Sequence, residues 1–121
     1  MRYMFLIYSR ETEEELTAED RDSIIGGHVA VLQDSTSKGV LLAAERLKPT
    51  AAATTVRVEG GKMLVTDGPF AETKEQLAGY YILECADLDE AMAWAARIPT
   101  GCRGGGGCIE IRPVDDLPDL G

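Results

Sequence analysis

The chain has 121 residues, of which 45% are hydrophobic and 27% are charged, a balance that fits one globular domain and excludes a disordered chain. Twelve basic against 21 acidic residues give a net charge of −9, and the sequence has no cluster of the Lys and Arg residues that a nucleic-acid-binding protein needs. No apolar run approaches the roughly 20 residues that span a bilayer, and residues 1–4 run straight into a strand-like pattern, so no signal peptide is expected. We therefore expect a cytoplasmic protein that binds neither nucleic acid nor membrane.

The first third of the chain predicts a strand and a long helix. Residues 3–8 (YMFLIY) are apolar at every position, which is typical of a central strand covered on both faces. Thr17, with Asp20 three residues later, resembles a capping box that opens a helix running to about Lys38, and Gly39 fits the stop that follows.

Two features inside this predicted helix concern its packing. Apolar residues and the single histidine recur on one helical face and predict the side that meets the sheet: Ile25, His28, Val29 and Leu32. Gly26 and Gly27 each cost about 1 kcal/mol relative to alanine inside a helix. Such a cost indicates close packing of another backbone or of a ligand, or else only a weak helix.

The middle of the chain predicts three further strands. Residues 40–47 form the first of them. Residues 54–59 and 62–66 flank Gly60-Gly61, a two-residue hairpin signal, so these two strands are expected to pair with each other.

The last third predicts a strand, a helix and a final strand. Residues 80–85 form a strand, and Asp87 caps a helix that runs to Ile98. Residues 108–112 form the last strand, and the Pro- and Asp-rich tail over residues 115–121 is expected to be flexible.

The order of these elements predicts an α+β fold. A β-α-β unit, a hairpin and a second β-α-β unit form a ferredoxin-like sandwich over residues 1–114, with both helices on one face of the sheet. The other face stays apolar, and a chain of 121 residues has nothing left to cover it. Two such sheets packed face to face bury both apolar faces, so we expect a homodimer.

The most unusual segment is the run DGPFAETKE over residues 67–75. Asp-Gly-Pro favours a sharp turn, because an Asp side chain accepts local backbone N–H bonds and proline fixes φ. The simpler interpretation is this turn followed by one helical turn of solvated charges. The functional interpretation puts Asp67, Glu72 and Lys74 at the mouth of a pocket beside the sheet. Phe70 is expected to insert into apolar surroundings.

These segments also carry a family resemblance. The chain resembles the DGPF branch of the YCII-related family from residue 1 to about residue 114, through the runs YMFLIY, GVLLAAERLKP, DGPFAETKEQLAGYY, DEAMAWAARIP and EIRPV. The resemblance implies a ferredoxin-like protomer and a dimer of the dimeric α+β barrel type. The broader family is associated with a histidine–aspartate pair in a pocket, proposed as an acid/base site, whose histidine lies on the first helix eleven residues before the glycine that ends it.

His28 stands eleven residues before Gly39 and so matches the family's histidine, and Asp67 is the candidate aspartate because it opens the loop expected to face that region. Without the resemblance, a lone histidine on an apolar helix face is more often a hydrogen-bonded core residue. The alternative is a general base, since imidazole has an unperturbed pKa near 6.5. The expected ligand pocket is lined by polar side chains: Arg57, Glu72, Lys74 and Tyr81.

No metal and no cofactor is expected. The three cysteines, Cys85, Cys102 and Cys108, include no CxxC pair, and their odd number indicates free thiols in a reducing cytoplasm. The glycine run over residues 104–107 lacks the Lys-Ser/Thr pair of a phosphate-binding P-loop.

Two functions remain open at this point. One is a cofactor-independent enzyme that acts on a small molecule, with His28 shuttling a proton and Asp67 orienting it. The other is a non-catalytic ligand-binding or regulatory protein. The resemblance implies a link of that kind to extracytoplasmic-function sigma factors, and a net charge of −9 is compatible with a basic protein partner.

Overall fold

The computed structural model describes residues 1–11, 17–100 and 106–119. The elements follow in the order β1 (Arg2–Ser9), α1 (Ala18–Ser37), β2 (Leu41–Arg46), the 3₁₀ turn η1 (Thr50–Ala52), β3 (Thr54–Glu59), β4 (Lys62–Asp67), β5 (Gln76–Glu84), α2 (Leu88–Ala95) and β6 (Gly107–Pro113). The predicted strands and helices are confirmed, and the largest differences lie at the start of β5 and the end of α2. β5 begins at Gln76 because its pairing with β1 extends that far, and α2 ends at Ala95 rather than at Ile98.

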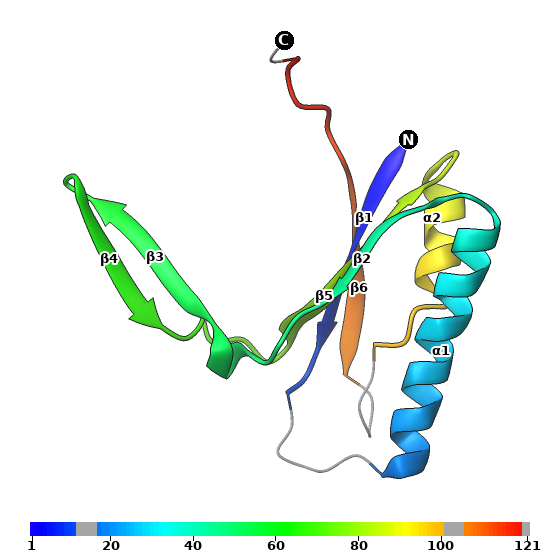
Figure 1. The fold of residues 1–121 in the computed structure, drawn as a ribbon, viewed down its shortest axis with the longest axis horizontal. Helices are drawn as coiled ribbons and strands as arrows, with labels where there is room; N and C mark the ends of the chain where they lie inside the picture. The colour runs from blue at the N-terminus through cyan, green and yellow to red at the C-terminus, as the bar shows by residue number, and fades with distance from the viewer. Residues whose placement is uncertain (12–16, 101–105, 120–121) are drawn as a thin grey trace.

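Four strands form an antiparallel sheet in the order β2-β5-β1-β6. Both helices cover one face of this sheet, and the β3–β4 hairpin extends away on the other side (Figure 1). The arrangement confirms the expected ferredoxin-like α+β fold. In one chain, therefore, only the helix-covered face of the sheet is closed.

The core lies between the sheet and the helices. Alternate residues of β1 and β5 point toward the helices and are buried: Tyr3, Phe5, Ile7, Tyr81 and Leu83. This period of two is what the pleat of a strand produces. The intervening residues of β1, such as Met4 and Leu6, are only partly buried, so their face is the open one.

The face that α1 presents to the sheet differs from the predicted stripe. Val31 and Ser35 are its buried residues, whereas Ile25 is 56% exposed and Val29 is 41% exposed. The prediction placed Ile25 and Val29 inward and was wrong there, because the helix is rotated so that Val31 and Ser35 meet the sheet. The Ser35 hydroxyl donates to the Val31 carbonyl at 2.7 Å, so it is buried with its hydrogen bond made inside its own helix.

The predicted N-caps of both helices and the close packing predicted at one of the two helix glycines are confirmed. The Thr17 side chain accepts the Asp20 N–H at 3.0 Å, and the Asp87 side chain accepts the Glu90 N–H at 2.9 Å, so both N-caps are present. Gly27 is required by packing, since a Cβ there would lie 2.5 Å from Pro99 Cγ. Gly26 has no such neighbour.

A charged cluster joins the end of α1 to α2. Asp34 Oδ2 accepts from Arg97 at 2.6 Å and from Lys38 at 3.3 Å. Both cations also lie over the Trp94 ring, at 5.2 Å for Lys38 Nζ and 4.8 Å for Arg97 Cζ. These contacts hold the two helices side by side on the sheet.

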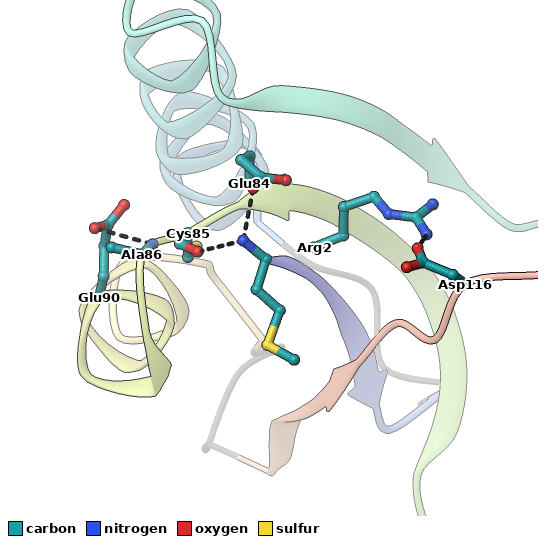
Figure 2. Close-up of polar contacts among 7 residues, drawn as sticks. Arg2, Glu84, Cys85, Ala86, Glu90 and Asp116 are labelled. Atoms are coloured by element: carbon teal, nitrogen blue, oxygen red, sulfur yellow. Dashed lines mark hydrogen bonds and ion pairs between the residues drawn. The ribbon is translucent and has the colours of Figure 1, made fainter.

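The strand ends are tied together by polar contacts (Figure 2). The amino group of Met1 donates to Glu84 Oε1 at 2.6 Å and to the Cys85 carbonyl at 3.0 Å. Arg2 pairs with Asp116 at 2.8 Å, and the Val114 N–H donates to the Arg2 carbonyl at 2.9 Å. The first part of the C-terminal tail thus runs along β1.

Candidate functional site

His28 on α1 and Tyr81 on β5 form a polar pair between the helix and the sheet. His28 Nδ1 lies 2.7 Å from the Tyr81 hydroxyl oxygen, and the two rings stack with centroids 6.0 Å apart at 15°. Tyr81 is buried and His28 is half-buried. The helix and the strand are 53 residues apart in sequence at this contact, so only the folded chain brings the pair together.

Burial sets the protonation of both groups. Burial first, and the positive charge of Arg46 second, lower the pKa of His28 below 6.5. Burial raises the pKa of Tyr81 above 10.0. At neutral pH the pair is therefore an uncharged imidazole beside an uncharged phenol. This is the state in which imidazole can accept a proton.

The second ring nitrogen of His28, Nε2, is the one available to a ligand. In the part of the chain that the structure describes, Nε2 makes no hydrogen bond. When Nδ1–H donates to the Tyr81 oxygen, Nε2 has a free lone pair; when the phenol donates to Nδ1, Nε2 carries the ring proton. The hydrogen bond to Tyr81 thus couples the tautomer of His28 to the orientation of one buried hydroxyl.

Two other predicted site residues lie on the hairpin. Asp67 is the last residue of β4 and pairs with Thr54, and Arg57 on β3 pairs with Leu64. The hairpin and α1 lie on opposite sides of the four-stranded sheet (Figure 1). Within one chain the structure therefore brings His28 to Tyr81 and brings neither Asp67 nor Arg57 to this pair.

The turn that begins at Asp67 is held by other groups than expected. The Gly68 N–H donates to the Ala53 carbonyl at 2.7 Å, and the Thr55 hydroxyl donates to the Gly68 carbonyl at 2.8 Å. Gly68 has φ +94°, a conformation that favours glycine. Residues 68–75 contain no helical turn, and Phe70 is 78% exposed. The predicted burial of Phe70 is wrong for the single chain, because the loop runs outside the sheet.

Glu72 and Lys74 lie in this exposed loop. Lys74 lines an open hollow of about 480 Å³ together with Tyr8, Thr73, Glu75 and Cys108. Glu75 Oε1 accepts the Gly107 N–H at 2.9 Å, and its Oε2 lies 3.7 Å from Cys108 Sγ. Glu75 thereby ties the loop to the start of β6, which makes it a structural carboxylate.

Arg46 is the site residue that the sequence alone did not single out. It follows Ala44 by two positions on β2, and Ala44 is the partner of Tyr81 in the sheet. Strand alternation therefore turns Arg46 to the same face as Tyr81. Only the register between β2 and β5 carries this information, and a single sequence does not contain it.

Comparison with known proteins adds the family. The family model for the YCII-related domain matches residues 1–117. The chain belongs to the YCII-related family. An uncharacterized protein of Rhizobium meliloti (strain 1021) is 37% identical over 115 residues, which cover 94% of this chain and 92% of that protein. The resemblance seen in the sequence is confirmed at the level of the family.

The thiols of this YCII-related chain do not add a nucleophile to the site. Cys85 is buried and Cys108 is exposed, and both are free; Cys102 lies outside the described residues. Burial, together with nearby carboxylates, raises the pKa of both thiols, with Glu90 acting on Cys85 and Glu75 on Cys108. Both remain protonated at neutral pH, and the thiolate is the reactive form.

Two further observations concern metals and membranes. Over residues 1–11, 17–100 and 106–119, His, Cys, Asp and Glu side chains nowhere gather in threes as a metal site would require. Neither helix in these ranges has the length and apolarity needed to cross a bilayer.

Proposed function

We propose that this YCII-related protein catalyses proton transfer on a small molecule, with His28 as the group that takes and returns the proton. The observation that supports this most is the 2.7 Å contact between His28 Nδ1 and the Tyr81 hydroxyl. It fixes one ring nitrogen on a buried group and leaves the other, Nε2, without a partner in the described chain.

The proton step follows from this geometry. With Nδ1–H donating to the phenol oxygen, Nε2 accepts a proton from the substrate, and His28 becomes an imidazolium. The same nitrogen then gives that proton to another atom of the substrate, so the imidazole is restored and no proton is gained or lost overall. Tyr81 stays protonated because burial raises its pKa. It orients the imidazole and does not itself exchange a proton with the substrate.

Asp67 enters the proposal through a homodimer. The hairpin that carries Asp67 extends away from its own α1 (Figure 1), so the carboxylate meets a His28 only when that histidine belongs to a second protomer. The exposed apolar side chains of the hairpin and the half-covered open face of the sheet support such an assembly. The free thiols Cys85 and Cys108 fit a reducing cytoplasm, where we place the protein.

Isotope exchange tests the proposal without a known substrate. The protein is incubated in D₂O with a panel of small carbonyl compounds and carboxylic acids, and mass spectrometry detects deuterium gained at carbon. Wild type should label at least one compound, and His28→Gln should not label it. Tyr81→Phe should slow the labelling by less than the roughly 100- to 10,000-fold that a positioned acid–base group contributes, because Tyr81 only orients the imidazole.

The matched control is Lys38→Gln. Lys38 is the C-cap of α1, its side chain is 59% exposed, and it lies neither on the open face of the sheet nor beside Tyr81, so this variant should label at the wild-type rate. Labelling by His28→Gln at the wild-type rate would overturn the proposal. A wild-type protein that labels no compound would overturn it as well.

The alternative function is a non-catalytic accessory protein in extracytoplasmic-function sigma factor signalling. A net charge of −9 favours a basic protein partner. This alternative predicts no isotope exchange by wild type, together with salt-sensitive binding of a purified sigma factor of that class. Binding that persists unchanged at high salt would contradict its electrostatic basis.

A further inference from the structure

Arg46 lies at the open margin of the His28–Tyr81 pair. β2 is an edge strand of the sheet, and α1 contacts it. Arg46 pairs with Gly79, two positions before Tyr81 on β5, and diagonal neighbours on one sheet face are within reach of a long side chain. The guanidinium therefore belongs to the same corner of the molecule as the imidazole, and it is exposed.

The charge of Arg46 is not neutralised within the described residues. Its neighbour Glu45 projects to the other face of the sheet, beside Tyr80. The positive charge of Arg46 is felt at His28, where, after burial, it helps to lower the pKa. Over residues 1–11, 17–100 and 106–119, a chain with a net charge of −9 thus leaves this guanidinium without a carboxylate partner.

Apolar side chains flank the same corner. Ile25 precedes His28 by three residues on α1 and is 56% exposed, and Val29 follows it and is 41% exposed. On a helix these positions lie on the solvent flank of His28, away from the buried Val31. Since Gly27 on the opposite flank meets Pro99, the Ile25 side of the helix is the one that borders β2.

We propose that the site accepts a small organic acid, whose carboxylate is bound by Arg46 and whose apolar part rests on Ile25 and Val29 beside His28. This inference rests on the proposed proton-transfer role of His28 and adds the class of substrate. A guanidinium binds a carboxylate through two parallel N–H···O bonds, and it therefore fixes the acid in one orientation. The exposed apolar pair favours an organic anion over inorganic phosphate.

Titration of the single histidine tests this directly. His28 gives the only imidazole signal of the chain, so its NMR shift and pKa are read without assignment. Butyrate is the probe. Saturation with butyrate should raise the pKa of His28, because a bound carboxylate places a negative charge beside the imidazole. Arg46→Gln should weaken butyrate binding on the order of tenfold, as expected for loss of a hydrogen bond to a charged group.

The controls separate the possible sources of the signal. Lys38→Gln, at the far end of α1, should bind butyrate like wild type, and inorganic phosphate should shift the His28 signal less than butyrate does. An equal response of Arg46→Gln to butyrate would overturn the inference. If phosphate shifts the His28 signal as strongly as butyrate does, the site does not prefer an organic acid, and that part of the inference is wrong.

A third variant keeps this test apart from the test of the proposed function. His28→Gln should still bind butyrate in ligand-observed NMR, because it retains Arg46 and the apolar flank. Binding by this variant together with no isotope exchange by wild type would sink the catalytic proposal and leave the anion site standing. If wild type catalyses isotope exchange but does not bind butyrate, the anion site is excluded and the catalytic proposal stands.

Discussion

The helix-covered sheet and the β3–β4 hairpin are both antiparallel, yet they differ in what stabilises them. In the sheet, Phe5 and Leu83 are fully buried beneath the two helices. In the hairpin, Val58 and Met63 face each other across the strands and are 72% and 68% exposed. Gly60 and Gly61, at φ +57° and +78°, give the hairpin its turn. Local turn chemistry thus shapes the hairpin, whereas burial stabilises the sheet, since an isolated two-stranded hairpin is only marginally stable in water.

Removal of a core ring should produce the largest difference between the two regions. Phe5→Ala should lower the free energy of unfolding by about 3–5 kcal/mol, the usual cost of emptying a buried aromatic site. Val58→Ala on the hairpin should lower it by much less than Phe5→Ala does, because valine is smaller and is 72% exposed in one protomer. Urea unfolding followed by circular dichroism measures both. Similar losses for the two variants would mean that the hairpin is covered in solution.

The hairpin should matter more for assembly than for folding. Wild type is expected to scatter light as about twice the 13.1 kDa chain. Val58→Ser combined with Met63→Ser should shift the mass toward 13.1 kDa with the circular dichroism spectrum retained, because both side chains lie on one exposed apolar face. A dimer that survives this double change would exclude this face as the contact, and a wild-type monomer would exclude the dimer itself.

A smaller effect should come from the pH dependence of the sheet region. The folded pKa of His28 lies below 6.5, so the unfolded chain binds more protons than the folded one as the pH falls below that value. The stability contributed by the neutral imidazole is therefore complete above pH 6.5 and is lost as the pH falls through the folded pKa. Arg46→Gln should move the NMR midpoint of His28 upward. A midpoint above 6.5 in wild type would contradict the burial argument.

The smallest effect is expected in the loop that joins the two regions. Phe70 is 78% exposed, so Phe70→Ala should change the free energy of unfolding by less than about 0.5 kcal/mol. Differential scanning calorimetry of wild type and variant measures this. A drop of several degrees in the melting temperature would show that the assembled protein buries the ring, which would extend the contact from the hairpin into the loop.

The features that depend only on neighbouring residues, namely the helix caps and the hairpin turn, could be predicted from the sequence. The two caps at Thr17 and Asp87 and the glycine pair of the hairpin are local, and each was predicted correctly. The rotation of α1 was mispredicted because a serine that bonds its own helix can be buried.

The candidate site was only half predictable. His28 was found through its spacing to Gly39, and Tyr81 was expected in the pocket but not as the partner of His28. Their contact and the place of Arg46 depend on how β2 and β5 register against each other and against α1. A strand slipped by one residue would turn Tyr81 to the other face. A single sequence does not specify that register, whereas the buried core of the folded chain does.

The adjacent glycines of α1 have a consequence for motion. Gly27 is needed for the approach of Pro99, but Gly26 has no such neighbour, and both raise the entropy that the helix loses on ordering. The amides of the helical turn that contains His28 should therefore exchange with solvent sooner than those around Val31 and Ser35, which the core holds in place. The group proposed to move protons thus stands on a turn of α1 that should open more readily than the turn around Val31 and Ser35, which would let the imidazole tilt while the sheet stays folded.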